Sequence, residues 1–121
     1  TGVKEFVATE DEFAKIEKPG HAIFKGMELN DLKWWNSPLS GPKVSKGVYR
    51  LDLSDQNIIP LVENIYPHAY GWKGPKTYPC FVYKYGEGQI LVSELRTSQW
   101  NTDPLACKAL SNIINWMFLS N

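Results

Sequence analysis

Residues 80–95 read CFVYKYGEGQILVSEL, and this stretch decides the fold class. Two runs rich in β-branched and aromatic residues flank the turn formed by Gly86, Glu87 and Gly88. Glycine adopts the positive φ angles that tight hairpin turns need, and we expect both glycines to supply them. The pattern therefore predicts a β-hairpin over about residues 80–95.

The C-terminal segment carries the second strong signal. Asp103 before Pro104 is a favoured helix start, because the carboxylate caps the first turn and proline fits its first position. Apolar side chains follow at helical spacing: Ala106, Leu110, Ile113 and Met117, widened by Ala109 and Trp116. We expect a helix over about residues 104–118 that packs on the sheet containing the hairpin. The fold class is therefore α/β.

The remaining strand signals are weaker. Residues 46–53 alternate apolar and polar side chains, as a half-buried strand does. Residues 58–62 form a second apolar run, in which Pro60 favours an edge or a strand start. Residues 3–7 look extended, and residues 11–16 predict a short helix because Phe13 and Ile16 are three positions apart.

Turns and loops separate these elements. Residues 21–26 form a short apolar run closed by a glycine turn, and residues 31–35 suit a single helical turn. Residues 66–79 are rich in aromatics, glycine and proline and predict a long loop. Long ordered loops in small domains are often functional.

Composition describes one globular domain of 121 residues with a formal net charge of zero. A nucleic-acid wrapper would need a basic surplus, so we expect no nucleic-acid partner. No apolar run approaches the eighteen or so residues of a membrane span, and no signal-peptide pattern is visible. We expect a soluble domain with no membrane partner, and the compartment stays open.

The two cysteines, Cys80 and Cys107, lack any CxxC spacing. A zinc site needs about four ligands, and only His21 and His68 could add to the two thiols. We interpret both cysteines as buried free thiols, although a disulfide stays open if the chain is secreted. No metal and no cofactor are expected.

Aromatic residues make up 13% of the chain and gather in turn-like segments. Aromatic faces beside polar side chains suit sugar rings, which makes five residues carbohydrate-binding candidates: Trp34, Trp35, Tyr70, Trp72 and Tyr78. The same rings could instead close a thin core, with Tyr66 among them, or contact a neighbouring domain.

A carboxylate pair is the second candidate site. Glycoside hydrolysis needs two acids about 5–10 Å apart, and Glu63 and Glu94 each border an apolar strand. No motif singles out these two among thirteen acidic residues. Walker, G-x-G-x-x-G and G-x-S-x-G sequences are absent, so no catalytic residue is assigned.

Two stretches resemble a known family. His21-Ala22-Ile23-Phe24-Lys25-Gly26-Met27, followed by Asp31-Leu32-Lys33-Trp34-Trp35, resembles a "HPxxxGL…DLxxW" segment. Residues 81–95 with Asp103-Pro104-Leu105-Ala106 and Asn112-Ile113-Ile114 resemble "EYxxGKGxxLxxQL…DPAAxxLLxNLLxY". Both are similar to the later half of the glutamine-amidotransferase-like, flavodoxin-like domains appended to bacterial family 2 glycoside hydrolases of the β-galactosidase type.

The resemblance implies an accessory domain without the Cys-His-Glu machinery of the amidotransferases. Ala22 replaces the usual proline, and the opening βαβα units of the family are missing. Either residues 1–121 are one domain cut from a larger protein, which a start at Thr1 rather than methionine favours, or the resemblance is partial and the domain closes its sheet in another way.

Three hypotheses follow. The first is a non-catalytic accessory domain of a multidomain glycoside hydrolase, which packs on the catalytic module or shapes carbohydrate access. Its partners would be other domains of the parent enzyme and an oligosaccharide. The second is an independent carbohydrate-binding module that uses Trp72 with Trp34 or Trp35, and the third is a small hydrolase acting through Glu63 and Glu94.

Overall fold

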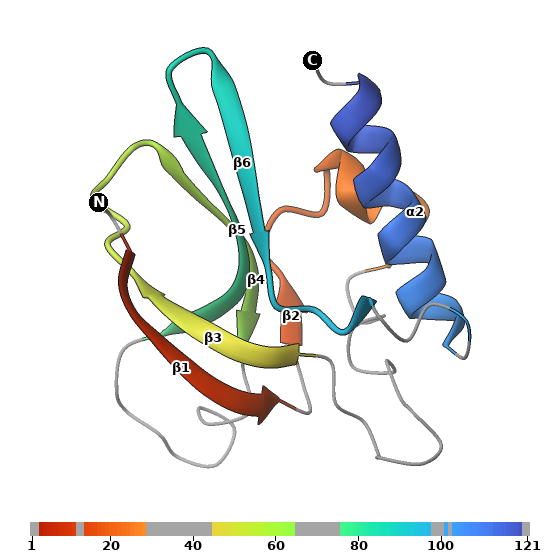
Figure 1. The fold of residues 1–121 in the computed structure, drawn as a ribbon, viewed down its shortest axis with the longest axis horizontal. Helices are drawn as coiled ribbons and strands as arrows, with labels where there is room; N and C mark the ends of the chain where they lie inside the picture. The colour runs from red at the N-terminus through yellow and green to blue at the C-terminus, as the bar shows by residue number, and fades with distance from the viewer. Residues whose placement is uncertain are drawn as a thin grey trace.

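The structure is a computed structural model that describes residues 3–11, 14–28, 45–64, 76–97, 101 and 103–119. These residues form an antiparallel sheet and a C-terminal helix, α2 (Pro104–Leu119), with a short 3-10 helix, η1 (Ala22–Phe24) (Figure 1). The strands are β1 (Val3–Asp11), β2 (Ala14–Ile16), β3 (Ser45–Leu51), β4 (Ile58–Asn64), β5 (Thr77–Tyr85) and β6 (Gly88–Ser93). Their order is β1-β3-β5-β4-β2, and β6 also pairs with β5.

Strand β5 is the centre of this sheet. One edge pairs with β4, while the other edge pairs with β3 at Tyr78 and with β6 from Cys80 onward. Residues 78–82 are all buried, so β5 is covered on both faces. A continuous buried run of this kind marks a strand between two packed layers rather than a strand with one wet face.

The hairpin predicted over residues 80–95 is confirmed as β5 and β6. Tyr85 pairs with Gly88, which leaves Gly86 and Glu87 as a two-residue turn. Gly86 has a φ of 58°, whereas Gly88 has no positive φ. A single glycine at the first turn position fits a type II′ turn, so the expectation that both glycines supply positive φ was wrong.

One core lies between the sheet and the two helices. Cys80 and Val82 alternate toward this face from β5, in line with the two-residue period of a strand. The buried members are Ala14, Ile16, Ile23, Phe24, Leu61, Val62, Cys80, Val82, Leu95, Ala106 and Ala109. Figure 1 shows η1 and α2 together on this side of the sheet.

A second packed region lies on the opposite face of β5, against the ribbon of β1 and β3. Phe81 is buried there and meets the ring of Tyr49 edge-on at 5.3 Å between centroids. Tyr49 in turn contacts the ring of Phe6 on β1 at 4.9 Å. Such tilted and edge-on ring pairs are the favoured aromatic geometries.

Pro60 fits its strand because of a local irregularity. Pro60 is opposite Phe81 and Val62 is opposite Cys80, so Leu61 is an extra residue in β4. Strand β2 pairs only with residues 62–64, and Pro60 therefore lies beyond the end of β2. The missing N–H of proline is tolerated at such an open edge beside a bulge, as the sequence indicated.

The helix predicted over residues 11–16 is wrong. Asp11 ends β1, and Ala14 and Ile16 belong to β2, where both are buried and Lys15 between them is exposed. Pairing of β2 with β4 decides the conformation here, since strand formation depends on its neighbours more than on local spacing. Phe13 lies outside the described residues.

The loop predicted over residues 66–79 is also partly wrong, because residues 77–79 belong to β5. The rest of that loop, apart from Lys76, lies outside the described residues, as does the helical turn predicted at 31–35. Strand β3 confirms the alternation over residues 46–53, although it ends at Leu51. The structure also confirms β1 as an extended segment from Val3 onward.

Helix α2 confirms the predicted helix and its cap. The Asp103 carboxylate accepts hydrogen bonds from the backbone N–H groups of Leu105 at 2.8 Å and Ala106 at 3.3 Å. Its buried line runs through Ala106, Ala109, Ile113 and Trp116. Met117 is 53% exposed, so its predicted place in the stripe was wrong.

A polar contact fixes the rotation of α2. The Asn112 side chain donates hydrogen bonds to the carbonyls of Ile23 and Lys25, at 3.0 and 2.9 Å. His21 caps η1 by accepting the Ile23 N–H, and its ring lies 5.6 Å from that of Trp116. Gly26 then turns the chain with a φ of 73°, which confirms the glycine turn predicted there.

Asn112→Ala should lower the free energy of unfolding by about 1–3 kcal/mol, because the carbonyls of Ile23 and Lys25 lose their donor. The matched control is Asn115→Ala, an exposed asparagine on the same helix, which should change stability far less. Urea denaturation of both variants measures the difference. Equal losses would mean that the contact with η1 adds no more to stability than an exposed asparagine of α2 does.

Stability should also depend on the charge of His21. Burial lowers the pKa of His21, so the folded state favours the neutral ring that accepts the Ile23 N–H. Its contribution is complete above the ordinary histidine pKa of about 6.5 and is lost as the pH falls below that value.

The variant His21→Asn keeps a capping acceptor that does not titrate. Unfolding free energies measured between pH 8 and pH 5 should therefore fall more steeply for the native chain than for this variant. Parallel curves would contradict the role of His21.

Candidate functional site

The structure describes one of the five carbohydrate-binding candidates. Trp34, Trp35, Tyr70 and Trp72 lie outside the described residues. Tyr78 lies in β5 opposite Tyr49 of β3, and it is only 4% exposed. A ring enclosed in this way offers little face for stacking on a sugar.

Tyr78 lies in a negative environment. Burial raises the pKa of its phenol, and the charges of Glu63 and Glu17 raise this pKa further. The phenol therefore stays protonated well above neutral pH and acts as a hydrogen-bond donor rather than as a base.

Glu63 is the most unusual residue on this face. Its side chain is 6% exposed, and its nearest charged partner is the Lys76 ammonium, 3.6 Å from Oε1. Oε2 is buried and has no hydrogen-bond partner among the described residues. A buried carboxylate oxygen without a donor costs about 1–3 kcal/mol or more, so such a group calls for an explanation.

Glu94 is held differently. The Tyr49 hydroxyl donates a hydrogen bond of 2.9 Å to Glu94 Oε1. Burial, followed by the bond and the charge of Glu94, raises the pKa of Tyr49 to about 12. The backbone N–H of Glu94 also donates to the carbonyl of Pro79 in β5, at 2.8 Å.

The two glutamates lie on the same face of the sheet, on either side of β5. Val62 and Ser93 are opposite Cys80, whose side chain enters the helix-side core. The next residues, Glu63 and Glu94, therefore project to the other face. Two strand spacings separate their backbones, about 10 Å. Together with Tyr49 and Tyr78 they form what we call the tyrosine–glutamate cluster.

The chemistry of this cluster does not favour hydrolysis. Inverting or retaining glycosidases need one carboxyl group to protonate the leaving group and the other to activate water or attack the sugar. Here Glu94 accepts a hydrogen bond from the Tyr49 hydroxyl, and the Glu63 side chain is almost fully buried beside Lys76. The arrangement suits hydrogen bonding to a polar ligand better than proton transfer.

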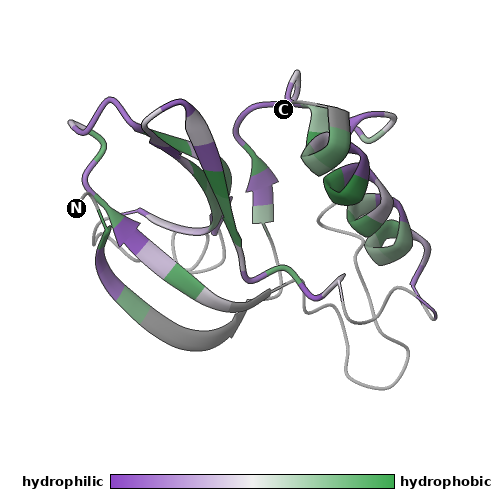
Figure 2. Cartoon of the chain, turned by 45° about the horizontal axis from the view of Figure 1, so that its top comes forward, coloured by the Kyte–Doolittle hydropathy of each residue, from purple (hydrophilic) through white to green (hydrophobic). Residues whose placement is uncertain are grey.

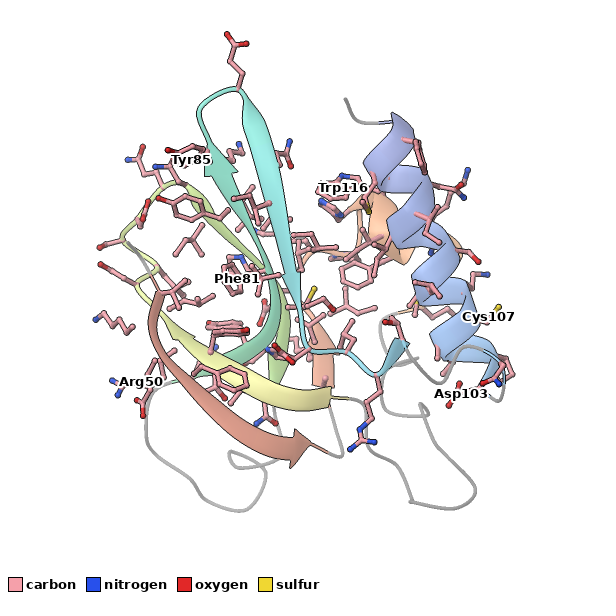
Figure 3. The ribbon with its side chains drawn as sticks, in the orientation of Figure 1. Arg50, Phe81, Tyr85, Asp103, Cys107 and Trp116 are labelled. Carbon is pink, nitrogen blue, oxygen red and sulfur yellow. The ribbon has the colours of Figure 1, made fainter. Side chains whose placement is uncertain are left out.

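The cysteines differ from each other. Cys80 is fully buried, and burial raises the pKa of its thiol to about 12, only partly offset by a bond with Ser93. Cys107 is exposed on the outer side of α2 (Figure 3), so its predicted burial was wrong. Both thiols are free. The reason is rotation: Ala106 and Ala109, not Cys107, face the sheet.

Within the described ranges, no group of three or more histidine, cysteine, aspartate or glutamate side chains could hold a metal ion. No helix in the described part of the chain is both long and apolar enough to cross a membrane.

Sequence reasoning missed several exposed apolar side chains. Tyr85 is 72% exposed on the side of the hairpin away from α2 (Figure 3), and Ile90 across the turn is also exposed. On α2, Ile114 and Phe118 are exposed as well. These residues belong to the alternating pattern of the hairpin and to the helical spacing of α2. Neither pattern shows which of its apolar residues another element of the fold covers.

Comparisons of the chain with protein-family models, with curated proteins and with solved structures find no match. Function therefore has to be inferred from the residues and contacts described above.

Tyr49→Phe should lower the free energy of unfolding by about 1–3 kcal/mol, because Glu94 loses a donor while the ring contacts with Phe6 and Phe81 stay. Tyr85→Phe is the matched control, since it removes a hydroxyl from an exposed tyrosine. Chemical denaturation measures both variants. A loss no larger than that of the control would show that the hydrogen bond contributes nothing to joining the two packed regions.

Proposed function

We propose that the chain is a non-catalytic accessory domain of a multidomain, β-galactosidase-type glycoside hydrolase. In this role it packs against the catalytic module or shapes the access of carbohydrate to it. The observation that carries the proposal is the outer face of α2, and two further features of the structure support it.

The outer face of α2 is apolar and almost without charge. Lys108 is the one charged residue among the sixteen of the helix, and Figure 2 shows the apolar colouring along most of it. Ile114 and Met117 are exposed, and Phe118 is 79% exposed. Large exposed apolar groups at neighbouring positions of one helix are typical of a surface that another protein element covers.

These residues continue a line along the helix. Cys107, Ser111, Ile114 and Phe118 follow one another at spacings of four, three and four residues, and all four are exposed. This is the spacing at which one helix presents a continuous stripe to a neighbouring element. A stripe of small and apolar side chains suits close packing against a second protein layer.

The first supporting feature concerns the two motif segments that resemble the family. Asn112 of the later segment binds the carbonyls of Ile23 and Lys25 of the earlier one, almost ninety residues away in the sequence. The motif residues thus hold η1 on α2, which is a structural role. A domain whose recognisable residues maintain its fold, rather than a reaction centre, suits an accessory function.

The second supporting feature is that the two glutamates are poorly placed for catalysis. Glu94 accepts a hydrogen bond from Tyr49, and the Glu63 side chain is buried. The finer part of the proposal is correspondence to the later half of a flavodoxin-like domain. Strands of that class run parallel. The described strands pair antiparallel, so this finer part of the proposal rests on the motif residues and not on the sheet.

Cys107 offers a direct test of docking on α2. It is exposed, whereas Cys80 is buried with a pKa raised to about 12, so an alkylating reagent should label Cys107 alone. Covering of the stripe should slow the labelling of Cys107 at least tenfold in the longer parent protein relative to residues 1–121.

Phe118→Glu introduced into the parent protein should restore fast labelling, because a buried carboxylate opposes docking. The control is Glu87→Gln on the hairpin turn, which should leave the protection in place. Equal labelling rates in the parent protein and in the isolated chain would contradict the proposed docking surface.

A further inference from the structure

Glu63 lacks the hydrogen bonds that a buried carboxylate normally has. A carboxylate accepts up to about four hydrogen bonds. Oε2 of Glu63 has none among the described residues, and the contact of Oε1 with Lys76 is 3.6 Å, longer than a hydrogen bond. The side chain is nevertheless more than nine-tenths buried. Stability alone does not account for a charge placed in this way, which points to a binding role.

The groups around Glu63 are polar and of both signs. The Lys76 ammonium is 3.6 Å from Glu63 Oε1 and its side chain is 62% exposed, so it can move aside at little cost. Tyr78 lies in β5 between Thr77 and Cys80, the partners of Asn64 and Val62, which places it across from Glu63. The Glu63 charge helps to raise the pKa of its phenol, so Tyr78 stays protonated as a donor. The set therefore contains an acceptor without a partner, a movable cationic donor and a hydroxyl.

This combination selects a class of ligand. Glu63 and Lys76 form one ion pair and Glu17 adds a further negative charge near Tyr78, so a strong anion is disfavoured. Among the described residues Glu63 belongs to no group of three side chains that could bind a metal ion, which disfavours a divalent cation. A neutral ligand with several hydroxyl groups can donate to Glu63 and accept from Lys76 and Tyr78 at once.

We propose that Glu63, Lys76 and Tyr78 form a binding site for the hydroxyl groups of a neutral carbohydrate. The sugar hydroxyl donates to Glu63 Oε2, and Lys76 moves aside to admit the sugar. Direct sugar binding by this chain goes beyond the docking role proposed above, and either can fail while the other stands.

The variant Glu63→Gln tests the site by two readouts. Residues 1–121 are titrated with lactose, cellobiose, maltose and xylobiose, followed by calorimetry and tryptophan fluorescence. At least one disaccharide should bind the native chain saturably, and Glu63→Gln should weaken that binding at least tenfold. The control Glu87→Gln, on the exposed hairpin turn, should bind within twofold of the native chain.

Thermal unfolding gives the second readout. Because glutamine removes a buried charge whose Oε2 has no hydrogen-bond donor among the described residues, the midpoint of Glu63→Gln should equal or exceed that of the native chain. A purely structural ion pair with Lys76 predicts a lower midpoint instead. Tyr78→Phe, which keeps the buried ring, should weaken sugar binding severalfold and serves if Glu63→Gln does not fold.

Four results would overturn the proposal. The first is that none of the four neutral disaccharides binds, and the second is that only glucuronate or Ca²⁺ binds. The third is that Glu63→Gln and Tyr78→Phe leave the sugar affinity unchanged. The fourth is a lower unfolding midpoint for Glu63→Gln. None of them bears on the labelling of Cys107, so the docking role of α2 is judged separately.

Discussion

Burial of β5 on both faces is the constraint on which the rest of the structure depends. Cys80 and Val82 enter the core beneath α2 and η1, while Phe81 enters the region beneath β1 and β3. A strand that has no wet face must be covered by two layers, so neither the helix nor the β1–β3 ribbon can be removed without exposing it. The position of the tyrosine–glutamate cluster follows, since its glutamates flank β5 and project toward the ribbon.

Local patterns predicted the hairpin and α2 because each is decided within a few residues. Gly86 determines the turn, and Asp103 with Pro104 determines where the helix begins. The rotation of α2 was not predictable in this way. It depends on Asn112 reaching η1, a contact across about ninety residues, and this rotation is why Met117 and Cys107 are exposed rather than buried.

The candidate site shows the same division. Glu63 and Glu94 were selected from the sequence because they border apolar strands, but their common face follows only from the pairing of β4 and β6 with β5. Tyr49 and Lys76 gave no sequence signal, since a tyrosine in an alternating strand and a lysine beside a loop are ordinary. The extended segment at 14–16 was missed for a related reason: its partner, β4, is almost fifty residues away.

The single pairing of β3 with β5, between Tyr49 and Tyr78, has a consequence for aggregation. Few backbone hydrogen bonds hold the ribbon to the central strand, so it can open without unfolding the helix-side core. Opening would uncover Phe81 and leave unpaired the edge of β3 that faces β5, and an unpaired strand edge is a template for pairing with another chain. The Tyr49–Glu94 hydrogen bond thus protects the protein from edge-to-edge association as well as stabilising its fold.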